Sequence, residues 1–456
     1  MKKKSNKLRI GIVSDIHVGF TGHLSKFYYG EGQPNVGPQE KWWEYILRYY
    51  KHRGVDVMVF PGDFTNACAY SDKNKTDAEY SYEEIIRAGE IYQKVFGGTK
   101  TKFVGIYGNH DEDCQAREIA NGGDKEFWEE SFGEPYTKVV HKVINGINFI
   151  GGHWGNEKEC IELIKKACSE NPDKPVIFMQ HNPISNTTRD CEYAGRRHIT
   201  IGFENIKEHE NLIALFGHTH APITDELNIW QSADESKGKC TVISCGTINY
   251  TGEIGDSRVL RGDNLMSKQG LYMTINGMDI DVERISFYTD EMLDLVKGKK
   301  KKQNFKKCTS SCGTNWKFTL GKEKIYDFEY RKQRASSYEF SPTAEVGVVR
   351  SDTIAQVSFP PAIYEKKEGN FLFTYRVEAY DVKTGELVSA DEVNTECHVD
   401  QTDKFFSKFY QAIIRGLLPN TSYEFRVYAK DCFGNLSKRP LKKVVETFAE
   451  NQVFLK

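Results

Sequence analysis

The segment LIALFGHTH, residues 212–220, joins a short apolar run to a glycine and two histidines. His218 and His220 lie two positions apart, and alternate side chains of an extended segment point to the same side. Both imidazoles can therefore reach one small volume, which suits a metal ion or a phosphate group. Two histidines on a loop are more often ordinary polar surface, so the rest of the chain has to decide between these interpretations.

The same pattern recurs along the first two thirds of the chain. The runs LRIGIVSD, VDVMVFPGD, TKFVGIYGNHD, INFIGGHWG and PVIFMQHNP each contain a short apolar stretch followed by Gly, Asp, Asn or His. Amphipathic segments, such as residues 42–50 and 82–96, separate several of them. This alternation predicts an α/β layered domain with a buried, largely parallel sheet. Ligands of such folds bind outside the carboxyl ends of the strands, so the polar residues there predict the place of the site.

The polar residues at these strand ends are mostly carboxylates and imidazoles. In chain order they are Asp15, His17, Asp63, Asn109, His110, His181, His218 and His220. Carboxylates and imidazoles are ligands for manganese, iron or zinc, and clustering them is costly unless a cation neutralises the aspartates. A set of unrelated, satisfied polar residues does not account for eight of them in this order. The sequence therefore predicts a metal centre.

Five motifs in this order, D-x-H, G-D, G-N-H-D, H and G-H-x-H, resemble the calcineurin-like metallophosphoesterase superfamily over about residues 8–285. The resemblance implies a four-layer α/β/β/α sandwich with a binuclear site for Mn, Fe or Zn. The implied ligands are Asp15, His17 and His220 for the first ion, Asn109, His181 and His218 for the second, and Asp63 as the bridge between them.

The candidate catalytic residues are His110 and Asp111. The resemblance places His110 over the phosphate, where it protonates the leaving oxygen or stabilises charge on the phosphoryl group. Asp111 either orients His110 by accepting its other N–H or caps a helix. His153, at another strand end, either borders the pocket or lies in the core. Arg196 and Arg197, in a loop-like insert, either hold an anionic group of the substrate or form solvated surface.

Tyr250 follows the GHTH segment and is a further candidate substrate contact. The implied reaction is hydrolysis of a phosphate mono- or diester by a hydroxide activated between the two ions, without a covalent phospho-enzyme. The alternative is a metal-binding but catalytically weak adhesion or scaffold protein, acting through its C-terminal domain.

From about Glu339 the pattern changes to alternating strands, such as TIAQVSF and YEFRVYAKD, separated by turn signals. That pattern predicts an antiparallel β-sandwich. LLPNTSY, residues 417–423, has the L-x-P-x-T-x-Y arrangement of a tyrosine corner. This part is similar to a fibronectin type III domain, which implies a protein or glycan ligand or a spacer role.

The expected domains are 1–297 for the phosphoesterase part, 298–338 for a linker or bridging segment, and 339–456 for the β-sandwich. The lysine-rich stretch from Lys297 to Lys307 either is a solvated linker or binds RNA, phosphoinositide or an acidic partner. Cys308 and Cys312 are either free thiols or a bridge or metal clip.

The bulk composition agrees with a multidomain globular chain. It has 456 residues, 39% hydrophobic and 28% charged, and its net charge of -2 gives no electrostatic case for nucleic acid as an obligatory partner. An odd number of cysteines, 11, argues against a complete disulfide framework. No run approaches the roughly 20 apolar residues of a membrane span. We therefore expect a cytoplasmic protein, or a secreted one if a leader was removed before numbering.

Overall fold

In the computed structural model, the described residues are 7–19, 37–66, 77–111, 126–153, 156–188, 201–251, 267–322, 324–363, 369–396 and 407–450. They form two units, one of Met1–Ile223 with Leu227–Phe328, the other of Thr224–Glu226 with Glu329–Lys456. Each unit is described by itself below.

The first unit contains two sheets. The strands of the first sheet are β1 (Leu8–Ile12), β2 (Val57–Phe60), β3 (Lys102–Gly105), β10 (Gln269–Asn276), β11 (Asp279–Ser286), β12 (Ser310–Ser311) and β13 (Trp316–Thr319). Their order is β12-β11-β10-β1-β2-β3, and β13 also pairs with β11. Strands β1, β2 and β3 are parallel, whereas β10 pairs antiparallel with both β1 and β11.

The second sheet has the order β4-β5-β6-β7-β9-β8. Its strands are β4 (Val139–Ile144), β5 (Ile147–Gly152), β6 (Val176–Met179), β7 (Leu212–Phe216), β8 (Ile229–Trp230) and β9 (Thr241–Ser244). Strands β5, β6, β7 and β9 are parallel. These are the apolar runs that the sequence predicts as buried strands.

Alternation of side chains along the strands explains the layers. In β2, Val57 and Val59 join the core between the two sheets, whereas Met58 and Phe60 join the core beneath the helices. Strand β6 divides in the same way between the inter-sheet core and a second outer core. Both faces of each sheet are thus apolar and must be covered.

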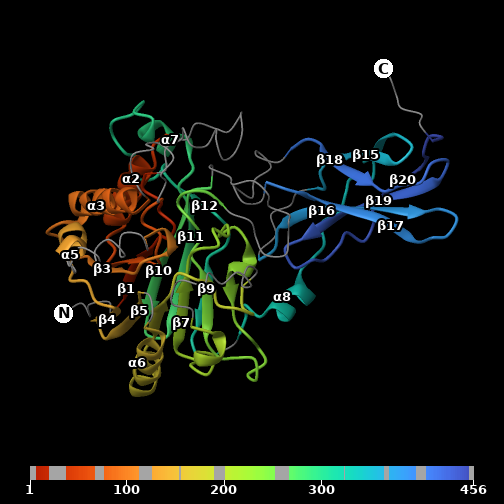
Figure 1. Cartoon of the computed structure of the whole chain (residues 1–456). Helices are drawn as coiled ribbons and strands as arrows, with labels where there is room; N and C mark the ends of the chain where they lie inside the picture. The colour runs from red at the N-terminus through yellow and green to blue at the C-terminus, as the bar shows by residue number, and fades with distance from the viewer. Residues whose placement is uncertain are drawn as a thin grey trace. The chain divides into compact units, whose positions relative to one another are not determined.

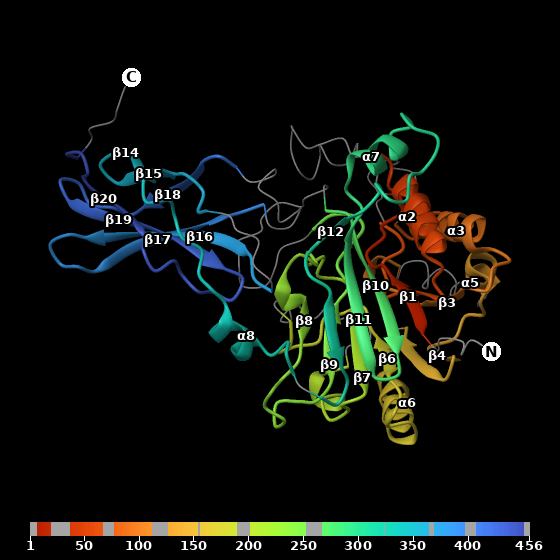
Figure 2. The same ribbon diagram turned by 180° about the vertical axis from the view of Figure 1, so that it is seen from behind.

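Helices cover the two outer faces (Figures 1 and 2). Helices α2 (Gln39–Arg53), α3 (Asp77–Phe96), α5 (Glu126–Phe132) and α7 (Asp290–Val296) contribute to the core on the first sheet, and α6 (Glu157–Glu170) to that on the second. The predicted four-layer α/β/β/α sandwich is confirmed. No described helix is long and apolar enough to cross a membrane.

The segment expected to be a linker or bridging segment, 298–338, contains strands of the first unit. Strands β12 and β13 within it pair with β11, and Trp316 is buried in the inter-sheet core. The division between the units falls between Phe328 and Glu329, within α8 (Phe328–Arg334). Apolar residues alternate in the run WKFT, which favours a short strand. The edge of β11 provides the partner for that strand. Cys308 and Cys312 are buried free thiols.

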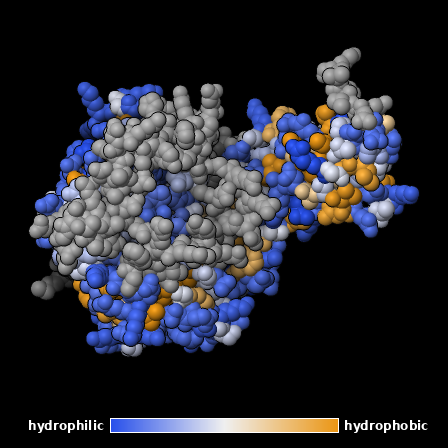
Figure 3. Space-filling view, viewed as in Figure 1, coloured by the Kyte–Doolittle hydropathy of each residue, from blue (hydrophilic) through white to orange (hydrophobic). Residues whose placement is uncertain are grey.

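The C-terminal unit is an antiparallel β-sandwich, as predicted. One sheet has the order β14-β15-β18 and the other β17-β16-β19-β20. The strands are β14 (Gly347–Arg350), β15 (Ile354–Phe359), β16 (Leu372–Asp381), β17 (Leu387–Asn394), β18 (Tyr410–Arg415), β19 (Ser422–Asp431) and β20 (Leu441–Glu446). The hydroxyl of Tyr423 accepts the N–H of Leu418 at 2.8 Å, which is the predicted tyrosine corner. Apolar side chains are prominent on the visible face of this unit (Figure 3).

Candidate metal centre

The loops that follow the parallel strands bring seven predicted residues together. Asp15 and His17 follow β1, Asp63 follows β2, Asn109 opens the 3-10 turn η1 (Asn109–Asp111) after β3, His181 follows β6, and His218 and His220 follow β7. The two sheets thus contribute to one site at the carboxyl ends of their strands, as layered α/β folds do.

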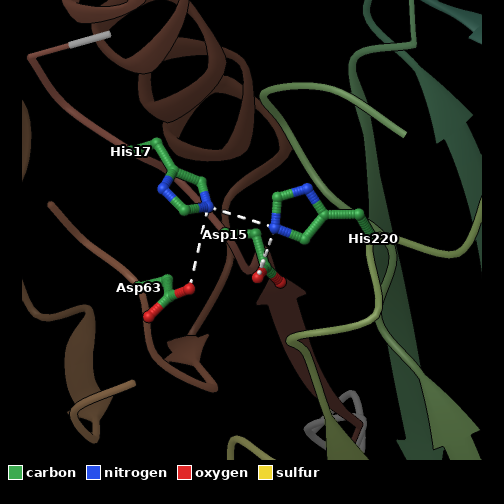
Figure 4. Close-up of side chains that lie close together, drawn as sticks. All are labelled: Asp15, His17, Asp63 and His220. Carbon is green, nitrogen blue, oxygen red and sulfur yellow. Dashed lines mark hydrogen bonds and ion pairs between the residues drawn. The ribbon is translucent and has the colours of Figure 1, made fainter. Parts of the chain in front are cut away.

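The first group consists of Asp15, His17, Asp63 and His220, all buried (Figure 4). Nε2 of His220 lies 3.0 Å from Oδ1 of Asp15 and 3.1 Å from Nε2 of His17. One potential ligand atom from each of the four residues lies within 4.8 Å of the others. Two carboxylates and two imidazoles at these separations are a donor set that fits a divalent cation.

The second group approaches the first through Asp63, and the N–H of His218 also donates to Oδ1 of Asp15 at 3.0 Å. Oδ1 of Asn109 lies 3.0 Å from Nε2 of His181 and 2.8 Å from Nδ1 of His218. Oδ2 of Asp63 lies 3.2 Å from Nε2 of His181 and 3.7 Å from Nε2 of His17 in the first group. The other Asp63 oxygen accepts the N–H of His110 at 2.9 Å. Oδ2 is therefore the atom of Asp63 that both groups share.

Backbone carbonyls orient two of the imidazoles. Nδ1 of His181 lies 2.8 Å from the oxygen of Pro61, and Nδ1 of His220 lies 2.9 Å from the oxygen of Tyr250. A carbonyl only accepts, so each Nδ1 carries the proton and each Nε2 faces the site as the potential ligand atom. The sequence gives no signal for such partners, because every residue has a carbonyl.

The backbone of the site is strained. Five of the seven gathered residues have a positive φ: Asp15 (52°), His17 (49°), Asp63 (56°), His218 (69°) and His220 (52°). The remaining non-glycine residues with positive φ in the described part of the chain are all asparagines. Asn, Asp and His are the non-glycine types found most often in this conformation. Each histidine or aspartate with a positive φ carries a strain of roughly 1–2 kcal/mol. Strain of this kind persists mainly at functional sites.

Comparison with known proteins finds a family match over part of the chain. Residues 8–222 match the family model of the calcineurin-like phosphoesterases, and all seven gathered residues lie within that range. The first unit contains a calcineurin-like phosphoesterase domain. None of the curated proteins compared with the chain matches it.

Several solved structures are similar to parts of the chain. A dimetal phosphatase from Danio rerio is 7% identical, with a TM-score of 0.40, over 69% of this chain and 99% of that one. A purple acid phosphatase from yellow lupin seeds is 14% identical, with a TM-score of 0.39, over 62% of this chain and 52% of that one. The FN5 domain of Drosophila Lar is 20% identical, with a TM-score of 0.16, over 23% of this chain and 92% of that one.

Charged groups of the site shift the pKa values of their neighbours. Burial alone would raise the pKa of Asp63, but His181, His110 and His17 lower it well below its ordinary value. Burial opposes the charged form of His181, but the Asp63 carboxylate outweighs it and raises the pKa of His181 to about 9. An imidazole must be neutral to bind a metal ion, so cation binding here would release protons.

Asp111 bonds to backbone N–H groups around the site. Its carboxylate accepts the N–H groups of Gly108, Phe64 and Thr65 at 2.8, 3.2 and 3.0 Å. Burial raises the pKa of Asp111 to about 7. Asp111 therefore ties the loop after β2 to the turn η1, beneath the site. The Nδ1 of His110 instead lies 3.0 Å from the carbonyl oxygen of Asn66.

His110 and Tyr250 flank the first group. The ring of His110 meets that of His17 edge-on at 4.7 Å, and His110 is half-buried. The ring of Tyr250, also half-buried, lies 5.8 Å from that of His17 and 4.3 Å from that of His220. Both side chains thus lie beside the first group and are partly exposed.

His153, another predicted substrate contact, is buried in the core. His153 is 1% exposed, and its Nδ1 accepts the N–H of Tyr107 at 3.0 Å. Burial lowers the pKa of His153 to about 3, so it is a neutral core residue, which is the alternative that the sequence left open. Arg196 and Arg197 lie outside the described residues.

Gln39 and Lys268 support the site and are missed by the sequence analysis. The amide nitrogen of Gln39 donates to the carbonyl oxygens of Ile16 at 2.7 Å and Ile248 at 2.9 Å. Its amide oxygen accepts from Lys268 Nζ at 3.1 Å, and Lys268 also donates to the Asn249 carbonyl at 2.5 Å. Gln39 and Lys268 thus link the loop after β1 to residues 248–250, in which the carbonyl of Tyr250 bonds to His220.

Proposed function

We propose that the protein hydrolyses phosphate esters at a centre of two metal ions. The observation that carries this proposal is the sharing of Asp63 Oδ2 between two groups of donors, at 3.7 Å from His17 and 3.2 Å from His181. Asp15, His17 and His220 would hold one ion and Asn109, His181 and His218 the other, with Asp63 between them. The donors are oxygen and imidazole nitrogen without a thiolate, a set that accepts Mn, Fe or Zn.

Ions bound there would supply a nucleophilic hydroxide at neutral pH and neutralise charge on the phosphoryl group. The residues of the chain do the remaining work. His110, whose Nδ1 faces the Asn66 carbonyl, would use Nε2 to donate a proton to the leaving oxygen. Such general acid assistance is typically worth 10²–10⁴-fold in rate.

The substrate class stays coarse in this proposal. The half-buried ring of Tyr250 beside His17 and His220 offers an apolar and hydroxyl surface to the group carried by the phosphate. Either a monoester or a diester fits the proposed chemistry. A catalytically weak scaffold protein is the competing function, and it would bind metal ions without turnover.

The test uses the full chain, stripped with a chelator and reloaded with Mn²⁺. Hydrolysis of a chromogenic phosphate monoester and of the matching diester is measured, with bound metal counted by mass spectrometry. Asp63→Asn should abolish most turnover and reduce bound metal, whereas Asp173→Asn, an exposed aspartate after α6, should change neither. Two bound ions per chain without turnover of either ester would overturn the proposal and favour the scaffold protein.

A further inference from the structure

The lysine-rich stretch from Lys297 to Lys307, here called the basic loop, is a fixed part of the first unit. The ring of Phe305 stacks on that of His52 in α2 at 4.0 Å, with an angle of 9° between the planes. The amide nitrogen of Gln303 donates to the carbonyl oxygen of Tyr45 at 3.0 Å, also in α2. Cys308, directly after the loop, is buried. These anchors hold the basic loop against α2.

The basic loop exposes a dense positive charge. Its lysines are all exposed: Lys297, Lys299, Lys300, Lys301, Lys302, Lys306 and Lys307. Within the described part of the chain, ion pairs from these lysines reach Glu291 at 2.5 Å and Asp294 at 3.8 Å, and both are made by Lys300. The loop contains no acidic residue, although the whole chain has a net charge of -2. The charge is therefore concentrated and largely uncompensated.

The basic loop begins at the edge of the domain that carries the metal ligands. Strands β1 and β11 both pair antiparallel with β10, so they run in the same direction. Asp15 follows β1 and α7 follows β11, so both lie at the same edge of the sheet. Gly37 lies against the side chain of Val296 at the end of α7, since a Cβ built on Gly37 would be 2.9 Å from that side chain. Gln39, two residues later, donates to the carbonyl oxygen of Ile16 in the loop after β1. Helix α6 is seen at the opposite end of this unit in Figure 1.

We propose that the basic loop docks the protein on an anionic lipid surface. Lysine carries a compact charge on a long flexible stem and needs no fixed partner geometry. Clusters of four to eight lysines or arginines are typical of proteins that bind acidic phospholipid headgroups. A flat, mobile layer of such headgroups matches seven lysines spread over one exposed loop.

Other anionic partners fit the loop less well. Proteins that bind single strands of nucleic acid stack bases on aromatic rings, and the aromatic ring of this loop, Phe305, is turned onto His52. Protein interfaces favour tyrosine, tryptophan and arginine and are depleted in lysine. Docking through the loop would bring the edge of the sheet that carries the proposed metal ligands close to the lipid surface. The docking does not depend on the proposed chemistry, so binding alone tests it.

The experiment is cosedimentation of the full chain with vesicles of phosphatidylcholine, with and without phosphatidylserine. We expect binding to the serine-containing vesicles alone, and we expect salt to weaken it. Lys301→Glu, Lys302→Glu and Lys306→Glu together should weaken binding by about tenfold or more. The matched control is Lys158→Glu, Lys165→Glu and Lys166→Glu on α6, which changes the net charge equally.

Unchanged circular dichroism of both triple variants would establish that each is folded. Equal binding to both kinds of vesicle, or equal losses in the two triple variants, would overturn the proposal. So would displacement from the vesicles by an equal charge concentration of an oligonucleotide, because the loop would then prefer nucleic acid.

Discussion

The Nε2 atoms of His17 and His220 face each other across 3.1 Å, although the two residues are 203 positions apart. Two imidazole nitrogens bound to one tetrahedral zinc ion, each at about 2.0–2.1 Å, would be separated by roughly 3.3 Å. The two rings are therefore already placed as a pair of ligands would be. Tyr250 holds one of them through its carbonyl oxygen, at 2.9 Å from Nδ1 of His220.

Removing one ring of this pair should remove one ion. We expect His220→Ala to bind one metal ion per chain where the unaltered protein binds two, because the second group keeps its donors. Metal counted after desalting tests this, with His209→Ala, outside the site, as the control. Two ions retained by His220→Ala would contradict the assignment of His220.

His110 should matter for rate and not for metal binding. His110→Asn should lower kcat by about 10²–10⁴-fold, the usual contribution of a general acid, while bound metal is unchanged. Steady-state kinetics on an ester with a poor leaving group should show the largest loss, since that group most needs a proton. Loss of metal in this variant would instead make His110 part of the ligand set.

The positive φ of 69° at His218 predicts an unusual order of stability. In metal-free protein, the free energy of unfolding of His218→Gly should be about 1 kcal/mol higher than that of His218→Ala, because glycine accepts this conformation without strain. Urea unfolding in a chelator measures both. At His209, which has no positive φ, alanine should be the more stable replacement. Equal stabilities at His218 would mean that its backbone relaxes without the metal.

Lys268 should make stability depend on pH. Burial lowers its pKa from 10.5 to about 7, so between these values the unfolded chain binds more protons than the folded protein. The free energy of unfolding should therefore rise with pH over this window, by about 2 kcal/mol between pH 7 and pH 9. Lys268→Met should lose this rise, whereas Lys165→Met, an exposed lysine on α6, should retain it. Equal pH profiles of urea unfolding would refute the assignment.

The position of β12 and β13 predicts where the chain can be divided. A fragment of residues 1–297 would lack both strands and leave the β11 edge open, with the core position of Trp316 empty. We expect it to aggregate, whereas residues 1–328 should elute as a discrete species in gel filtration. A well-behaved shorter fragment would show that the two strands are dispensable.

Local sequence patterns predicted most of the sheet strands and the seven gathered residues. Apolar runs define buried strands wherever they fold, and polar residues directly after them can lie only at the strand ends. Strand β12 was missed because two residues show no period, and β13 because its alternation extends over four residues only. The sequence left two roles open for Asp111, because the direction of its side chain depends on the loop after β2, 47 positions away. Gln39 and Lys268 act on backbone carbonyls, which leave no pattern in a sequence.

The strained loops of the site have a consequence for the living cell. Without cations, five residues with positive φ and two buried aspartates reduce the stability of the folded chain, and ions that bind only the folded chain restore it. Newly synthesised protein would then survive proteolysis in proportion to the supply of the ion. We expect its cellular abundance, and not only its activity, to follow metal availability.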